Sequence, residues 1–192
     1  MTERIEILDG MLAKIASTMA GVRADQLDLP TPCPDFDVRV LLDHLVTWLR
    51  VFDGAINERV LDWDPNAGQT YDDWTERFTA AGESALGGLR AQGFDRPMTM
   101  TTDPMPGHVV LEMMLMEYVG HGWDLAVASN QLSPFSDDEV EVAMTSATGL
   151  IQSEHRGSQS YFDHIVEVSD AAGPTERFVA FLGRDPSWAE ES

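Results

Sequence analysis

Three ionisable side chains share one face of the most apolar stretch of the chain, residues 106–130. Glu117, His121 and Asp124 follow one another at spacings of four and three residues, so on an α-helix they fall within an arc of about 60°. Glu112 lies on the opposite side of the same helix. The other residues of the stretch are mostly Val, Leu, Met, Tyr, Trp and Ala, and a helix that is apolar on all sides is one that its neighbours bury. Because a buried ionisable group is costly unless it is paired or binds a metal, this stripe is the candidate chemical site.

Metal binding is the chemistry that these residue types favour. Glu117 and His121 lie one helical turn apart, so both side chains can reach one ion. A second histidine, His44, lies on the flank of the apolar face of an earlier helix and points toward the core or a cavity. Two imidazoles and one carboxylate are the donor set of a catalytic zinc site, which leaves a fourth position for water or substrate. Nickel, cobalt or iron would accept the same donors.

Two further features of this spacing bear on the prediction. Asp124, one turn beyond His121, is a candidate acceptor that would fix the tautomer of that imidazole. A Glu and a His four residues apart also occur often by chance. The alternative is therefore a buried Glu–His hydrogen bond that holds two helices together, with His44 as a satisfied core histidine beside Trp48.

Helical periodicity dominates the rest of the chain and predicts an all-α fold. Helices are expected over residues 2–20, from 35 or 37 to about 57, 70–91, 106–130, from 136 to about 153, and 175–182, with capping boxes at 70–73 and 136–139. Residues 93–107 are expected to form an extended loop with at most one strand, and residues 164–168 a short strand. This pattern of four or five long helices predicts an α-helical bundle over residues 1–155, and a C-terminal appendage over residues 156–192 that packs on the bundle.

The amino-acid composition limits the classes of partner that the protein is expected to bind. Thirty-three acidic against twelve basic residues give a formal charge of −21, which argues against binding to nucleic acid or to an anionic membrane surface. The single cysteine, Cys33, excludes an intrachain disulfide and is expected to be a half-buried structural thiol. The sequence contains neither a signal peptide nor an apolar stretch of about 20 residues, so a cytoplasmic protein is expected. Exposed apolar helix surface allows a homodimer.

The remaining histidines and Arg184 are expected to play no part in the chemistry. His108 opens the central helix too far along its axis to reach the same ion, and His155 and His164 lie in a weakly patterned region. Arg184 is expected to make a capping contact or a structural salt link.

Three segments of the chain carry a resemblance to a known family: TPCPDFDVRVLLDHL at 31–45, EYVGHGWDLAVA at 117–128 and FVAFLGRDP at 178–186. In combination they resemble the mycothiol-dependent maleylpyruvate isomerase N-terminal family, within the DinB-like superfamily of four-helix metal proteins. The resemblance implies a divalent metal, most often zinc, held by His44, Glu117 and His121. It also implies a low-molecular-weight thiol such as mycothiol as co-substrate, in an isomerisation or S-transfer on a small electrophilic substrate.

One departure separates this chain from the isomerase itself. That enzyme carries a separate C-terminal domain, whereas here residues 156–192 are too few for such a domain. The chain therefore resembles the short, single-domain, mostly uncharacterised branch of the family. Two alternatives stay open at this point: a hydrolase that uses metal-bound hydroxide, and a non-enzymatic ligand-binding or stress-response module of the DinB-like fold.

Overall fold

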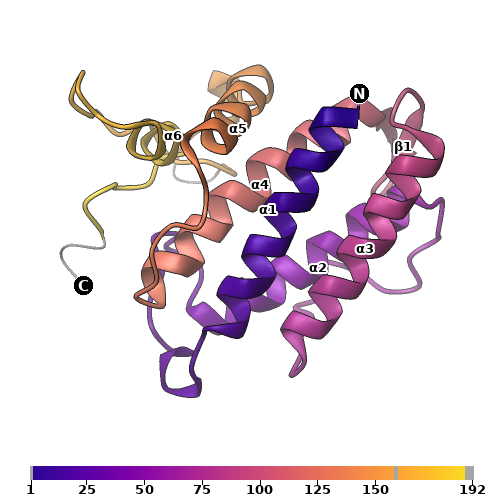
Figure 1. The fold of residues 1–192 in the computed structure, drawn as a ribbon, viewed down its shortest axis with the longest axis horizontal. Coiled ribbons are helices and arrows are strands. Elements are labelled where there is room, and N and C mark those ends of the chain that lie inside the picture. The colour runs from indigo at the N-terminus through magenta and orange to yellow at the C-terminus, as the bar shows by residue number, and fades with distance from the viewer. Residues whose placement is uncertain (1, 158–159, 189–192) are drawn as a thin grey trace.

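The computed structural model describes residues 2–157 and 160–188, and these residues are mainly helical (Figure 1). They form six α-helices, α1 (Thr2–Ala20), α2 (Val38–Ile56), α3 (Trp74–Gln92), α4 (Gly107–Ala128), α5 (Asp137–Leu150) and α6 (Pro174–Phe181). Two short 3-10 turns, η1 (Ala24–Gln26) and η2 (Ser153–His155), and two short strands, β1 (Pro97–Thr99) and β2 (Pro104–Pro106), complete the secondary structure of the described residues.

The first four α-helices pack against one another around a shared core. Helix α1 contacts α3 and α4, and α2 contacts the same two helices. Helix α5 packs on α4 and α6 packs on α5, so the C-terminal part of the chain is attached to the rest through α4 (Figure 1). The largest fully buried side chains, among them Leu8, Leu45, Phe78 and Tyr118, come from all four of the first helices.

Helix α4 is buried on most of its surface, as its composition predicts. Its residues are buried along nearly the whole length. The carboxylate on its opposite face, Glu112, is paired with Arg4 of α1 and with the Ser146 hydroxyl of α5. Neighbouring elements therefore supply polar partners to both charged faces of α4, the face with Glu112 and the face with Glu117 and Asp124.

Helix α2 begins where its capping residue predicts. The Asp37 carboxylate accepts a hydrogen bond of 2.8 Å from the backbone N of Val40, which satisfies one of the free amide groups of the first turn. This start places His44 in the second turn of α2, on the side that faces α4.

The predicted start of α3 is wrong by four residues. The expected capping box at 70–73 does not form, and the helix begins at Trp74. The reason is a long-range contact: Asp43 of α2 accepts hydrogen bonds from the backbone N of Tyr71 (2.9 Å) and from Nε1 of Trp74 (2.6 Å). These contacts hold the segment before α3 against α2 in a non-helical conformation.

Both strand predictions are wrong: one expected too few strands, and the other expected a strand that does not form. Residues 93–107 contain two strands rather than at most one, since β1 pairs with β2 in an antiparallel register that matches Met98 to Met105. Residues 164–168 form no strand, because a single hydrogen bond from Val166 N to Ala180 O joins them to another segment rather than a ladder. Helix α5 ends at Leu150, before the predicted end at about 153. None of the described helices combines the length and the apolar character needed to cross a membrane.

Glu139 closes the N-terminus of α5 and links it to α1. Its carboxylate accepts hydrogen bonds from the backbone N of Ser136 (2.7 Å) and from Nζ of Lys14 (2.5 Å). Burial would raise the pKa of Glu139, but these hydrogen bonds outweigh burial and lower it.

We expect Glu139→Gln to lower the free energy of unfolding by about 1 kcal/mol at neutral pH, because the amide keeps the shape but loses the charged hydrogen bonds. A folded-state pKa below the unfolded value means that this contribution is complete above the unfolded pKa and is lost as the pH falls through the folded one. Urea unfolding at neutral and at acid pH measures it. The exposed neighbour Asp138→Asn is the control; a deficit of Glu139→Gln that persists at acid pH would contradict the assignment.

Candidate metal centre

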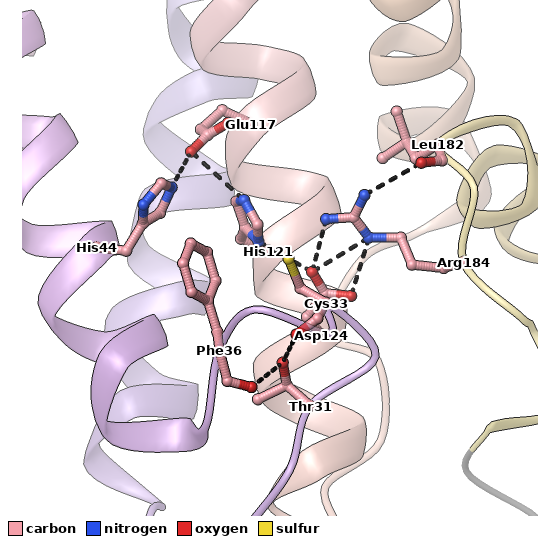
Figure 2. A network of polar contacts seen from close by, with 9 residues as sticks. All are labelled: Thr31, Cys33, Phe36, His44, Glu117, His121, Asp124, Leu182 and Arg184. Atoms are coloured by element: carbon pink, nitrogen blue, oxygen red, sulfur yellow. Dashed lines mark hydrogen bonds and ion pairs between the residues drawn. The ribbon is translucent and has the colours of Figure 1, made fainter. Parts of the chain in front are cut away.

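Two helices bring three potential metal ligands together. Nε2 of His44 on α2 lies 2.7 Å from Oε1 of Glu117 on α4, and Nε2 of His121 lies 3.7 Å from the same oxygen. One donor atom from each residue falls within 4.8 Å of the other two. Figure 2 shows the two imidazoles turned toward the carboxylate from different helices.

Asp124 settles which nitrogen of His121 faces this cluster. Nδ1 of His121 lies 2.9 Å from Oδ2 of Asp124, one turn further along α4. Burial would raise the pKa of Asp124, but the charge of Arg184 and the hydrogen bonds from His121 and Arg184 outweigh burial and lower it. The carboxylate is thus ionised and only accepts, so Nδ1 of His121 donates and Nε2 is the nitrogen that faces Glu117.

The Glu117 carboxyl is held in its charged form, as a metal ligand must be. Burial would raise its pKa, but the neighbouring His121, the hydrogen bond from His44 and the charge of Arg184 lower the pKa to about 2. An anionic oxygen therefore faces two imidazole nitrogens at neutral pH.

The donor set and its spacing fit a divalent ion. A tetrahedral zinc ion with bonds of about 2.0–2.1 Å separates neighbouring donors by about 3.3–3.4 Å. The separation of 3.7 Å between Nε2 of His121 and Glu117 is close to that value. The separation of 2.7 Å between His44 and Glu117 is shorter, so binding requires this contact to open by about 0.6–0.7 Å.

The side chains at the cluster and behind it differ in their exposure to solvent. The side chains of His44 and Glu117 keep 21% and 23% of their surface exposed, whereas Asp124 is 0% exposed. The cluster is therefore reached from the side of His44 and Glu117 and closed on the side of Asp124. Two hollows elsewhere on the described structure, of about 620 and 420 Å³, are lined by other residues and include none of the three candidate ligands.

The loop before α2 covers the cluster. The ring of Phe36 lies 4.8 Å from that of His44 and 5.8 Å from that of His121, measured between centroids. The Thr31 hydroxyl lies 2.9 Å from the carbonyl oxygens of Cys33 and Phe36 and so ties the loop together (Figure 2). Phe36 forms an apolar wall over both imidazoles. Nothing in the sequence pattern alone identified it.

Cys33 lies in this loop but is not an activated nucleophile. It is half-buried. Its burial outweighs the attraction of the nearby Arg184 and raises its pKa to about 11. At neutral pH the side chain is a thiol, and the thiolate is the reactive form.

The other histidines lie away from the cluster. His108 and His164 are exposed. Nδ1 of His155 accepts a hydrogen bond from the backbone N of Gln152. The sequence predicted a salt link for Arg184 but not its place. Nη2 of Arg184 lies 2.9 Å from Oδ2 of Asp124, directly behind the cluster.

Comparison with known proteins gives a family and two relatives. Residues 8–126 match the model of the family described as the mycothiol maleylpyruvate isomerase N-terminal domain. Two proteins of Mycobacterium tuberculosis, from strains CDC 1551 / Oshkosh and ATCC 25618 / H37Rv, are both described as uncharacterized. Each is 28% identical to this chain over 180 residues, which cover 88% of the chain and 91% of the relative. No solved structure matches the chain significantly.

The hydrogen bond to Asp124 predicts that Nδ1 of His121 carries a proton. In metal-free protein, we expect Nδ1 to donate this proton to the ionised carboxylate of Asp124, which can only accept. Two-dimensional ¹⁵N–¹H spectra of the imidazole nitrogens show whether Nδ1 is protonated. Asp124→Asn should weaken this preference, since an amide can also donate, and the exposed His108 should be unaffected. An unprotonated Nδ1 of His121 in the wild-type protein would contradict the arrangement.

Proposed function

The chain belongs to the mycothiol maleylpyruvate isomerase N-terminal domain family, and we propose that it is a metal-dependent enzyme that uses a thiol of the mycothiol type. Its substrate is a small electrophile, and the reaction is an isomerisation or an S-transfer. The observation that carries the proposal is the convergence of His44, Glu117 and His121 on one point between α2 and α4. The family supports the thiol, and the donor set supports the metal.

The proposed metal is zinc, with nickel as the second candidate. Imidazole and carboxylate ligands suit both ions, and a set of three protein ligands leaves a position open in a tetrahedral site. We assign the fold that holds it to the DinB-like four-helix bundle, made by α1 to α4, with α5 as the extra helix. In this assignment residues 1–155 are the metal-binding domain and residues 156–192 are an appendage packed on it.

The residues around the cluster have separate roles in this proposal. A divalent cation favours thiolate over thiol and so supplies a nucleophile at neutral pH. The exposed sides of His44 and Glu117 admit a small molecule, and the Phe36 ring offers it an apolar surface. Asp124 is occupied by His121 and Arg184, so it orients the imidazole rather than taking a proton from a substrate.

The proposal first requires a bound metal. We expect wild-type protein, purified without a histidine tag, to bind one equivalent of zinc, and His44→Ala, Glu117→Ala and His121→Ala each to weaken binding strongly. Zinc should also raise the melting temperature, because it binds only the folded protein; free zinc at 100 times Kd stabilises by about 2.7 kcal/mol. Elemental analysis and thermal unfolding with and without chelator measure both effects.

His108→Ala is the matched control for this experiment, since His108 is exposed at the start of the same helix. It should bind zinc as the wild type does. Less than one equivalent of metal in the wild type, unchanged by His121→Ala, would instead favour the metal-free alternative. In that case the contact between His44 and Glu117 is a hydrogen bond between helices, and the protein is a binding module.

The thiol is tested on cobalt-substituted protein. If a low-molecular-weight thiol occupies the open position, adding mycothiol should produce a sulfur-to-cobalt charge-transfer band and change the visible spectrum. The matched control is the same titration with an alcohol analogue that lacks the sulfur. A spectrum that does not respond to the thiol would reject the thiol-dependent reaction and favour a hydrolase or a structural ion.

A further inference from the structure

Arg184 is a buried arginine that reaches the cluster from the far end of the chain. Its side chain is 10% exposed. Nε lies 3.1 Å from Oδ1 of Asp124 and 3.3 Å from Oδ2, and Nη2 lies 2.9 Å from Oδ2 (Figure 2). Nη1 donates to the carbonyl oxygen of Leu182 at 3.3 Å. The guanidinium therefore donates hydrogen bonds to both oxygens of the Asp124 carboxylate, which in turn orients His121.

The chain is shaped to bring this arginine to α4. After α6, Gly183 adopts a φ of +89°, which side chains rarely allow, and a Cβ there would lie 2.9 Å from Cβ of Asp163. Leu182 packs on α4 at Gly120, where a Cβ would meet Cδ1 of Leu182 at 2.9 Å. A glycine on each side thus permits the approach of the segment that carries Arg184.

The contact between Arg184 and Asp124 constrains the carboxylate more than a surface salt bridge would. Oδ2 of Asp124 accepts from His121 and from Arg184 at once. A guanidinium is planar, and its fork fixes the plane of a carboxylate, which a single ammonium cannot do. Without Arg184, this fully buried carboxylate would have only the imidazole as a partner, and an uncompensated buried charge rearranges or destabilises its surroundings.

We propose that Arg184 is a positioning residue of the metal centre: it holds the Asp124 carboxylate in the plane that keeps Nδ1 of His121 donating and Nε2 aimed at Glu117. Arg184 lies outside residues 8–126, the part that matches the family model. The C-terminal segment therefore completes a site whose other residues all come from the matched part. The metal readout of this inference rests on the proposed function, but the imidazole readout does not.

Five variants separate positioning from a merely structural role. Arg184→Met removes the guanidinium, and Arg184→Lys keeps the charge but loses the fork. Arg177→Met is the matched control, because Arg177 of α6 also ties the C-terminal part to a neighbouring helix, through an exposed ion pair with Glu141 of α5. Asp124→Asn, alone and combined with Arg184→Met, tests whether the arginine acts through the carboxylate.

The first readout is the affinity for zinc, measured by competition with a chromophoric chelator. We expect Arg184→Met to weaken binding about 10- to 100-fold, the usual effect of losing a group behind a ligand, and Arg184→Lys to weaken it less. Arg177→Met should bind as the wild type does. Adding Arg184→Met to Asp124→Asn should cause no further loss.

The second readout is the ¹⁵N signature of His121 in metal-free protein. We expect Arg184→Lys and Arg184→Met to weaken the Nδ1–H preference and Arg177→Met to keep it. If Arg184→Met does not fold, Arg184→Lys decides the question. Wild-type affinity and wild-type tautomer in the Arg184 variants, or equal losses in Arg177→Met, would overturn the inference. If the wild type itself binds no zinc, the proposed function fails, and the imidazole signal still decides the role of Arg184.

Discussion

The hydrogen bond between His44 and Glu117 joins α2 to α4 where both helices turn ionisable groups inward. From there a row of contacts runs toward the C-terminal segment: Glu117 lies beside His121, Nδ1 of His121 donates to Asp124, and Asp124 accepts from Arg184. Burial raises the cost of each of these groups, so each must find an opposite partner. The row of five side chains satisfies that requirement, and it leaves imidazole and carboxylate donors facing one point.

The local part of this arrangement is predictable from sequence, and the long-range part is not. Glu117, His121 and Asp124 lie on one helix at spacings of four and three, so helix geometry alone aligns them. Arg184 is 60 residues from Asp124, and only the packing of Leu182 on Gly120 brings it there. The same limit explains the start of α3. A capping pattern at 70–73 predicted it too early, since the competing contact with Asp43 comes from another helix.

The hydrogen bond between His44 and Glu117 and the proposed metal site at the same residues do not exclude each other. The contact of 2.7 Å between His44 and Glu117 is the interhelical hydrogen bond of the plainer alternative. It also keeps two donors close and oriented, which lowers the cost of organising a site when an ion binds. The proposed thiol of the mycothiol type rests on the family and not on this geometry, and the relatives from Mycobacterium tuberculosis, both described as uncharacterized, add no substrate.

The central claim is that one ion is held jointly by α2 and α4. X-ray absorption at the zinc edge of the loaded protein tests it most directly, because it reports the ligands around the ion itself. The account predicts two imidazoles and one carboxylate oxygen at about 2.0–2.1 Å, with a water oxygen as the fourth ligand when no thiol is bound. Loss of one imidazole shell in His44→Ala would assign that ligand to α2. A first shell of water oxygens alone, or one that His44→Ala leaves unchanged, would contradict the account.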